Sequence, residues 1–211
     1  MIGVRQLNLR GYSHQTRVDG AAVVKQFTGP QAVIRCATER AALTNLAGRL
    51  PVPRLLAAGD TLLRTALLPG VHGQELIENG HAAPVLASCG RMLRHLQHVV
   101  PGLVHGDYGP NNLLFDPDTF EVTGIVDWEW AHPGAPVEDL AWTEWIIRRH
   151  HPDDVAALTH LFTAYGETPV WELRHAVGLA KCRAMRDRPD NDPADAAHWQ
   201  RNIAITAAWT A

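Results

Sequence analysis

The chain has 211 residues, an apolar content of 46% and a charged content of 19%, values that are typical of globular proteins and exclude an intrinsically disordered chain. Its net charge is −3 and its basic residues are scattered rather than gathered in a stripe, which excludes the usual pattern of a nucleic-acid binder. No apolar run approaches the roughly 20 residues of a membrane span, and the N-terminus lacks the apolar core of a secretory signal, so we expect a cytoplasmic protein that does not enter membranes.

The charge is distributed unevenly along the chain. Residues 1–100 hold 11 Lys+Arg against 5 Asp+Glu, whereas residues 101–138 hold no basic residue against 7 acidic ones. A basic half followed by an acidic segment favours a protein that binds polyphosphate on one side and metal ions on the other. Lys25 and Lys181 are the only lysines in the sequence, which makes the position of Lys25 noticeable.

The length allows one compact domain or two small lobes. The three cysteines, Cys36, Cys89 and Cys182, are odd in number, lie far apart and form no CxxC pair. Disulfides are rare in the reducing cytosol, so we expect three free thiols.

The N-terminal segment has the alternation and turn residues of antiparallel strands. Residues 6–9 predict a first strand, and residues 11–16 predict a polar loop. Asp19-Gly20 predicts a hairpin turn between two further strands, residues 16–18 and 22–27. Polar hairpins are common, so this pattern alone does not indicate a function.

A helix is predicted over residues 30–49, and it ends before the two prolines of residues 51–53. Its apolar residues recur at near-helical spacing: Val33, Cys36, Ala37, Ala41, Leu43, Leu46 and Leu50. Glu39 lies in the middle of this helix. Taken alone, it would be an exposed glutamate paired with Arg35 or Arg40.

Two short strands are predicted next, at about residues 54–58 and 61–67, before Leu68-Pro69-Gly70 breaks the pattern. A plain loop between strands would explain that break. Residues 74–99 predict two helices. The apolar face of the second helix is formed by Val85, Leu86, Cys89, Met92, Leu93 and Leu96.

The stretch from Leu103 to Ala131 predicts a strand, a tight loop, a strand, a turn and a strand. Asp107 and Asp127 follow apolar runs, and Asn112 precedes another. A polar side chain at the end of a buried strand can reach into a cleft while the strand holds it in place. Carboxylate and amide oxygens without a neighbouring Cys or His cluster suit Mg²⁺ better than zinc.

From residue 136 to the end the pattern is helical, with breaks near residues 166–169 and 187–193. Asp139 lies in the first turn of the first of these helices, where the helix dipole favours a carboxylate. Five tryptophans fall in this half: Trp142, Trp145, Trp171, Trp199 and Trp209. Most are expected in the core, and one or two could line a substrate pocket.

Two motifs in the central stretch together resemble the aminoglycoside phosphotransferase and choline kinase family. His105-Gly106-Asp107 is followed after four residues by Asn112, and Ile125-Val126-Asp127-Trp128-Glu129 comes later. These enzymes are small-molecule relatives of protein kinases, with an H-G-D-x-x-x-x-N catalytic loop and a metal-binding Asp in I-D-W-E. His-Gly-Asp alone would be read as a turn, so the spacing of the two motifs carries the resemblance.

The resemblance covers about residues 7–145 and implies a bilobal α+β fold similar to that of protein kinases. Residues 1–68 would form an N-terminal nucleotide-binding lobe, a small antiparallel sheet with one helix. Residues 69–211 would form a mostly helical C-terminal lobe that carries the catalytic and substrate-binding groups. The last 65 or so residues carry little family signal, so their fold is predicted from periodicity alone.

The resemblance also implies roles in the catalytic segment. Asp107 would accept the proton of the substrate hydroxyl, and Asn112 and Asp127 would bind Mg²⁺ on the phosphates of ATP. His105 would support the loop rather than touch the substrate. Asp139, in an Asp-Leu-Ala motif, would brace the catalytic loop through backbone hydrogen bonds.

In the N-terminal lobe the resemblance implies a nucleotide site. Lys25, in the V-x-K strand, would hold the α- and β-phosphates, and Glu39 would orient it. Backbone groups around Ala66 and Leu68, at the hinge between the lobes, would bind adenine.

The string from Gly11 to Val18 looks like the family's nucleotide loop, in which Ser13 and Thr16 would approach the phosphates. The loop departs from the usual G-x-S-N-x-T-y-x-V form. His14 stands where the family has Asn, and one residue is missing near Arg17.

These features predict a phosphotransferase that uses ATP and Mg²⁺ to phosphorylate a hydroxyl of a small molecule, with an antibiotic such as an aminoglycoside among the candidate acceptors. A metabolic kinase of the choline or homoserine type and a nucleotide-binding pseudokinase are the alternatives. An aminoglycoside needs an acidic pocket, to which Glu129, Glu138 and Glu144 could contribute. A less cationic antibiotic, a nucleoside, a sugar and an amino alcohol are equal candidates for the acceptor.

Overall fold

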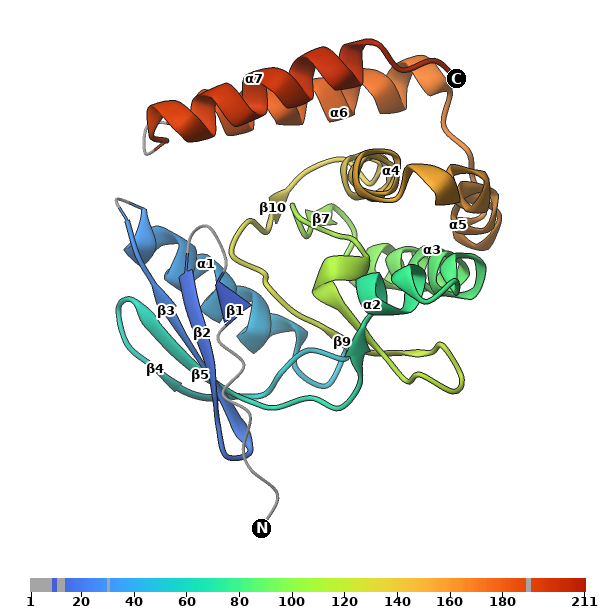
Figure 1. Cartoon of the computed structure of the whole chain (residues 1–211). Coiled ribbons are helices and arrows are strands. Elements are labelled where there is room, and N and C mark those ends of the chain that lie inside the picture. The colour runs from blue at the N-terminus through green and yellow to red at the C-terminus, as the bar shows by residue number, and fades with distance from the viewer. Residues whose placement is uncertain (1–8, 11–13, 30, 189–190) are drawn as a thin grey trace.

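The first third of the chain forms a five-stranded antiparallel sheet, with strand order β1-β2-β3-β5-β4, and one helix, α1 (Figure 1). The computed structural model describes residues 9–10, 14–29, 31–188 and 191–211. The elements are β1 (Leu9–Arg10), β2 (His14–Asp19), β3 (Ala22–Phe27), α1 (Ala32–Leu46), β4 (Leu55–Ala58) and β5 (Leu62–Ala66).

The β2–β3 hairpin forms as predicted, but its turn lies one residue later. Asp19 pairs with Ala22 across the two strands, so the two-residue turn is Gly20-Ala21. Gly20 has a φ of 61°. Two-residue hairpins need a positive φ at the first turn position, which glycine adopts without steric cost, and this places the glycine first in the turn.

Helix α1 begins and ends inside the predicted range, and of the apolar residues that the spacing indicated, Cys36, Leu43, Leu46 and Leu50 are buried. Val33, Ala37 and Ala41 are exposed, whereas Arg35 and Glu39 are buried together with the apolar residues of the inner face. A pattern based on apolar residues alone misses a face that carries charges, because buried charged side chains occur where partners neutralise them.

The connection from β5 into the rest of the chain is tightly packed. The hydroxyl Oγ1 of Thr123 donates a hydrogen bond to the carbonyl of Pro69 at 2.7 Å. Gly70 has a φ of 116°, and a Cβ added there would lie 2.7 Å from the backbone oxygen of Phe115. Glycine is therefore required at this point of the connection.

The predicted strand, loop and strand pattern of the central stretch is confirmed. Its strands belong to two small antiparallel sheets, which they form with β6 from before the stretch and β10 from after it. One sheet has the order β6-β8-β9, and the other pairs β10 with β7. The elements are β6 (Val71–His72), β7 (Leu103–Val104), the 3₁₀ turn η1 (Pro110–Asn112), β8 (Leu113–Phe115), β9 (Val122–Ile125) and β10 (His132–Pro133).

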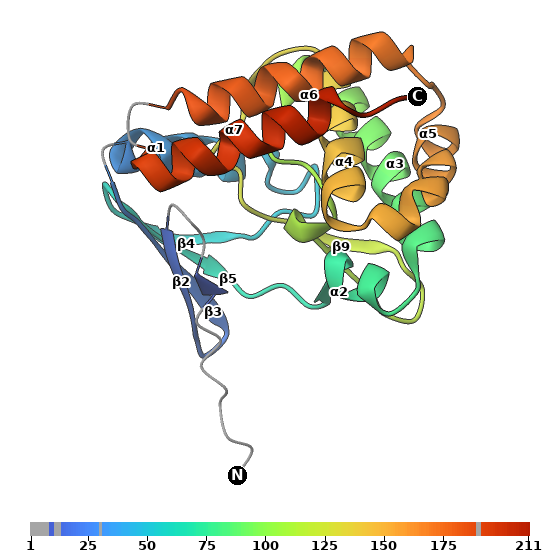
Figure 2. The same ribbon diagram turned by 45° about the horizontal axis from the view of Figure 1, so that its top comes forward.

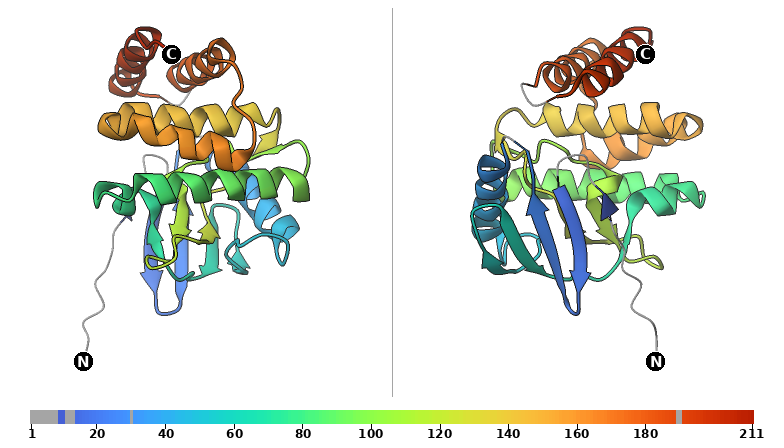
Figure 3. Two further views of the ribbon diagram at one scale, coloured as in Figure 1. Left: turned by 90° about the vertical axis from the view of Figure 1, so that its right-hand side faces the viewer. Right: turned by 60° about the vertical axis from the view of Figure 1, so that its left-hand side comes forward.

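The remaining elements are helical. Helices α6 and α7 lie side by side (Figure 2), and they stack above α4 and α5, which in turn lie above α3 (Figure 3). The predicted breaks near residues 166–169 and 187–193 are confirmed, since α5 ends at Tyr165 and α7 begins at Pro193. The helices are α2 (Gly73–Glu78), α3 (Ala82–Val99), α4 (Val137–His150), η2 (Pro152–Ala157), α5 (Leu158–Tyr165), α6 (Trp171–Arg186) and α7 (Pro193–Ala207).

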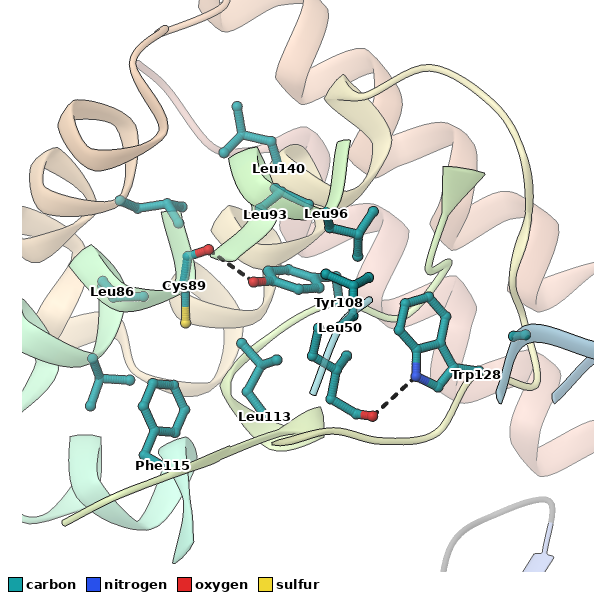
Figure 4. Packing of buried hydrophobic residues seen from close by; sticks show 14 of the residues in the cluster. Leu50, Leu86, Cys89, Leu93, Leu96, Tyr108, Leu113, Phe115, Trp128 and Leu140 are labelled. Carbon is teal, nitrogen blue, oxygen red and sulfur yellow. Dashed lines mark hydrogen bonds between the residues drawn. The ribbon is translucent and has the colours of Figure 1, made fainter. Parts of the chain in front are cut away.

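Two fully buried aromatic side chains fix the central loops in the core (Figure 4). Tyr108 donates its hydroxyl hydrogen to the carbonyl of Cys89 at 2.9 Å. Trp128 donates its indole N–H to the carbonyl of Ile125 at 3.0 Å. A large buried ring whose polar group is hydrogen-bonded holds its backbone in one position. Tyr108 follows Asp107, and Trp128 follows Asp127. The packing of these two rings in the core therefore fixes the backbone next to each aspartate.

The structure confirms an α+β architecture with an antiparallel sheet and a helical C-terminal part. The predicted free thiols are also confirmed, since Cys36, Cys89 and Cys182 are unpaired and buried. Within the described ranges, none of the helices combines the length and apolar character that crossing a bilayer requires. The division of the chain at residues 68 and 69 stays a prediction.

Candidate active site

Lys25, on β3, lies at the centre of a cluster of three carboxylates that come from two other segments, α1 and the residues after β9. Its Nζ lies 2.6 Å from Oε2 of Glu39 on α1 and 2.6 Å from Oδ1 of Asp127, which follows β9. A third carboxylate, Glu129, lies 3.5 Å away. The predicted pairing of Lys25 with Glu39 is present, and the same ammonium group reaches Asp127, a residue more than 100 positions later in the chain.

Arg35 extends this cluster by a second buried ion pair. Its Nη1 lies 3.2 Å from Oε2 of Glu129, and its Nη2 donates to the carbonyl of Thr28. Arg35 therefore pairs with Glu129 rather than with Glu39, and Glu39 is not an exposed helix residue. Two cations and three carboxylates leave the cluster with an excess negative charge, which favours an additional cation.

The electrostatics of the cluster favour a charged Lys25. Burial alone would lower its pKa, but the carboxylates of Asp127, Glu39 and Glu129 outweigh burial and hold the pKa above its ordinary value. Burial raises the pKa of Glu39, which Lys25 partly offsets. An ammonium group held charged between carboxylates can exchange one of them for a phosphate oxygen at little cost in charge.

Asp107 is held by neutral hydrogen-bond donors. Its Oδ1 accepts from the indole Nε1 of Trp142 at 2.7 Å, and its Oδ2 accepts from Nδ2 of Asn112 at 2.8 Å. The same amide nitrogen also donates to the backbone carbonyl of Asp107 at 2.8 Å. Both donors point at defined oxygen atoms, so the carboxylate has one orientation.

Burial raises the pKa of Asp107, and the nearby ammonium of Lys181 and the two hydrogen bonds lower it in part. Lys181 comes from α6, donates to the carbonyl of Gly106, and lies 3.8 Å above the ring of Trp142. Burial lowers the pKa of Lys181 to about 8. A carboxylate with a raised pKa is a better proton acceptor than an ordinary aspartate, provided that it remains ionised.

Asp139 holds the loop that carries Asp107 in place. Its two oxygens accept the backbone N–H groups of His105 and Gly106 at 2.7 and 3.0 Å. This is the bracing role that the resemblance implied. His105 is fully buried, its Nε2 donates to the carbonyl of Val126 at 3.0 Å, and its Nδ1 accepts from the backbone N–H of Asp107 at 3.2 Å. Burial lowers the pKa of His105, which keeps the ring neutral.

The loops that carry Asn112 and Asp127 are joined directly. The backbone N–H of Val126 donates to the carbonyl of Asn112 at 3.0 Å. Asp127 itself has a φ of 67°, a left-handed conformation that few residues other than glycine adopt. Such strain persists where the surroundings fix the residue, and it is common at functional sites.

The remaining nucleotide-site predictions have different structural outcomes. Thr16 lies on β2 directly opposite Lys25, and it is half-buried. Ser13 lies outside the described residues. The backbone N–H of Ala66 already donates to the carbonyl of Arg54 at 2.8 Å, which leaves other backbone groups of the hinge for a ligand. The side chain of Leu68 packs against Gly124, where an added Cβ would lie 2.6 Å from its Cδ1.

Sequence reasoning did not assign roles to Trp142 and Lys181. Trp142 follows Asp139 by three residues on α4, and residues at that spacing share a helix face. Because Asp139 was expected to touch the catalytic loop, the spacing could have indicated that Trp142 does so too. For Lys181 the signal was its rarity as a residue type, which said nothing about its partner.

Two of the acidic residues that were considered for a cationic substrate are neutralised inside the protein. Glu129 pairs with Arg35 and Lys25. Glu144 pairs with Arg174 at 2.6 Å and with Arg148 at 2.9 Å. Of the three, Glu138 alone keeps a partly exposed side chain, at 38%, so the predicted acidic surface for an aminoglycoside is reduced to one carboxylate.

The donor groups at the site fit a hard divalent cation. The carboxylate of Asp127 remains partly exposed, at 21% of its side chain. The amide nitrogen of Asn112 donates to Asp107, which turns the amide oxygen to the opposite side. Carboxylate and amide oxygens are the ligands that Mg²⁺ accepts, with water and phosphate oxygens completing its shell.

Solved structures with the same fold include aminoglycoside phosphotransferases. The gentamicin complex of APH(2")-IIa matches with a TM-score of 0.71 at 12% identity, over 95% of this chain and 90% of that chain. A thermostable mutant of aminoglycoside phosphotransferase APH(4)-Ia with ADP and hygromycin B matches with a TM-score of 0.65 at 16% identity, over 98% and 95%. At these identities the likeness shows the fold alone, and it confirms the bilobal, protein-kinase-like architecture.

Among curated proteins, viomycin phosphotransferase of Streptomyces vinaceus is 32% identical over 102 residues, which are 41% of this chain and 36% of that protein. Acyl-CoA dehydrogenase family member 10 of Mus musculus is 44% identical over 41 residues, 19% of this chain and 4% of that protein. The chain thus spans about a third or less of the length of these relatives. The model of the phosphotransferase enzyme family matches residues 5–101 and 92–177. The chain belongs to the phosphotransferase enzyme family.

Proposed function

We propose that this protein transfers the γ-phosphoryl group of ATP to a hydroxyl of a small molecule in a magnesium-dependent reaction. The observation that carries the proposal is the convergence of two groups of side chains. Lys25 bridges Glu39 and Asp127 at 2.6 Å each, and Asp107 is oriented by Trp142 on a loop hydrogen-bonded to the Asp127 segment. Phosphoryl transfer needs positioning and charge neutralisation, which these groups can supply.

In this reaction Lys25, oriented by Glu39, binds the α- and β-phosphates and gives up its direct contact with Asp127. Thr16, on the strand opposite Lys25, approaches the phosphates, and the predicted contact of Ser13 with the phosphates is part of the same proposal. Backbone groups of the hinge near residues 66 and 68 bind adenine. The geometry of Thr16 across from Lys25 supports the first of these contacts.

Asn112 and Asp127 hold Mg²⁺, which neutralises charge on the phosphates when it is bound. Asp107 accepts the proton of the acceptor hydroxyl as the new O–P bond forms and the bond between the γ-phosphorus and the departing ADP oxygen breaks. The neutral donors Trp142 and Asn112 keep the carboxylate of Asp107 in one orientation during this step.

The names of the relatives support an antibiotic as the acceptor. Viomycin phosphotransferase is the curated relative with the largest shared segment, and similar structures hold gentamicin or hygromycin B. Metabolic kinases of the choline or homoserine type remain the alternative enzyme class, and a nucleotide-binding pseudokinase the alternative without transfer.

The test is ADP release by the purified protein with Mg²⁺ and ATP against a panel of hydroxyl acceptors that includes viomycin, gentamicin, choline and homoserine. Acceptor-stimulated ADP release that disappears with EDTA supports the proposal. ATP binding without ADP release in the presence of any of these acceptors, or of 3-hydroxydecanoate, would favour the pseudokinase.

A further inference from the structure

A cleft of about 700 Å³ lies beside the catalytic loop, between α6 and the segment that leads from Asp127 into α4. Gly106 and Trp130 line it, one residue before Asp107 and three residues after Asp127. Sites that hold a drug-sized molecule have volumes of roughly 300–1,000 Å³. The cleft is therefore large enough for an acceptor and adjoins both functional loops.

The walls of this cleft are mainly apolar. From α6 they include Leu173, Val177, Ala180 and Ala184, which recur at helical spacing and form one face of the helix. Leu173 is 46% exposed, so this apolar face is open to a ligand rather than packed against another element. Binding here gains from the burial of apolar surface.

The carboxylates in the cleft are already engaged. Asp139 is buried and accepts backbone N–H groups with both oxygens. Glu138 accepts from the backbone N–H of Ala135 at 2.7 Å and lies 3.1 Å from Nε2 of His132. A ligand with several ammonium groups would find one exposed carboxylate at the rim, and that one already has two partners.

Two cationic side chains also line the cleft. The guanidinium of Arg188 lies 3.7 Å above the ring of Trp130, and the ammonium of Lys181 lies 3.8 Å above that of Trp142. Positive groups in the wall of an apolar cleft repel a polycation and attract an anion. Together with Glu138 and Asp139, these two side chains give the described lining as many cations as carboxylates, so the cleft lacks the excess negative charge that would favour an aminoglycoside.

We infer that the acceptor of this protein is a hydroxylated molecule with an apolar body that is neutral or anionic, and that it binds on the exposed face of α6. This inference rests on the proposed phosphoryl transfer. The apolar body lies against Leu173 and Val177, and the hydroxyl reaches Asp107 from the side of Gly106. The acceptor class thus differs from the cationic ligands named for the structural neighbours.

The binding part of the inference can be tested without turnover. The probe is 8-anilinonaphthalene-1-sulfonate, an apolar anion whose fluorescence rises in apolar sites. Leu173→Glu places a negative charge on the cleft wall and should weaken probe binding by about tenfold or more. Ile205→Glu is the matched control, because Ile205 is 41% exposed on α7 and does not line the cleft. This variant should bind the probe within about twofold of the wild type.

Displacement of the probe then separates the two ligand classes. 3-Hydroxydecanoate should displace it from the wild type, whereas gentamicin should not. Equal probe binding by the wild type and Leu173→Glu, an absence of binding by the wild type, or displacement by gentamicin as effective as that by 3-hydroxydecanoate would overturn the inference.

ADP release measured with the same two compounds distinguishes this inference from the proposed function. Faster release with 3-hydroxydecanoate than with gentamicin supports both. Faster release with gentamicin overturns the inference and leaves the proposed function standing. Displacement of the probe by 3-hydroxydecanoate and not by gentamicin, with no ADP release in the presence of any acceptor, supports the ligand class of the cleft and contradicts phosphoryl transfer.

Discussion

The Lys25 cluster and the Asp107 cluster are both buried and polar, but different forces hold them. Around Lys25, charged groups neutralise one another: the ammonium faces Glu39, Asp127 and Glu129. Asp107 is held instead by an indole and an amide, two neutral donors. The first cluster can exchange partners when a charged ligand arrives, whereas the second keeps one geometry.

This difference matches the two tasks that phosphoryl transfer imposes. Binding a nucleotide brings in negative charge, so the groups that receive it must give up existing ion pairs. Orienting a hydroxyl needs a base that stays in place, and neutral donors fix a carboxylate without cancelling its charge.

The largest effect is expected for Asp107→Asn, which removes the proton acceptor and keeps the size of the side chain. Turnover should fall by roughly 10²–10⁴-fold, because that is the typical contribution of a general base. ATP binding should persist, since the Lys25 cluster is intact. Steady-state ADP release and ATP titration measure the two quantities. Asp118→Asn, at an exposed turn residue, is the control, and wild-type turnover by Asp107→Asn would contradict the assignment.

Lys25→Met tests the charge balance of the first cluster. Removing one partner of a buried ion pair typically costs about 3–5 kcal/mol in the free energy of unfolding, because the carboxylates are left uncompensated. The double variant Lys25→Met with Glu39→Gln removes one of those charges and should be more stable than the single variant. Urea unfolding measures both. Equal stability of the two variants would show that the carboxylates are not coupled through Lys25.

Trp142→Phe tests the hydrogen bond between the indole of Trp142 and the carboxylate of Asp107. It removes an N–H donor to a carboxylate, an interaction worth about 1.5–3 kcal/mol. We expect kcat to fall with little change in the KM for ATP. The Trp142 hydrogen bond lowers the pKa of Asp107, so its loss raises that pKa and moves the acid limb of the kcat profile to higher pH.

Trp145→Phe is the matched control for that variant. Trp145 stacks on Trp142 with ring centroids 4.4 Å apart, but its indole N–H donates to Oγ1 of Thr206 at 2.8 Å. Its loss should affect stability rather than the pH profile of kcat. An identical shift of the acid limb in both variants would assign the effect to packing and not to the hydrogen bond with Asp107.

The smallest effect is expected for Lys181→Met and concerns the pH dependence of stability. Burial lowers the pKa of Lys181 from 10.5 to about 8 in the folded state. Between these values the unfolded chain binds the proton and the folded protein releases it, so the stability conferred by Lys181 rises with pH. Relative to Lys181→Met, the wild type should therefore gain free energy of unfolding from pH 8 towards pH 10.5.

Urea unfolding at three pH values across that window measures the difference. Lys181→Arg is the control, because arginine does not titrate there. A constant difference between the wild type and Lys181→Met at all three values would contradict the lowered pKa.

The sequence was most informative where short spacings fix the geometry. The hairpin, the α3 face and the strands of the central stretch follow local patterns of apolar and turn residues, and the structure contains all of them. The pairing of Lys25 with Glu39 was expected from a family motif. The buried face of α1 was predicted only in part, because Arg35 and Glu39 also occupy it and a search for apolar periodicity treats charged residues as exposed.

The side chains that share a loop could be predicted from the sequence, since His105 to Asn112 and Asp127 to Glu129 are short segments with defined spacing. Only the tertiary structure decided their partners. Arg35 meets Glu129 across 94 residues, Lys181 meets Gly106 across 75, and Trp142 meets Asp107 across 35. Such contacts depend on how helices and loops pack after they form, and no local periodicity encodes which distant side chain that packing brings to a given atom.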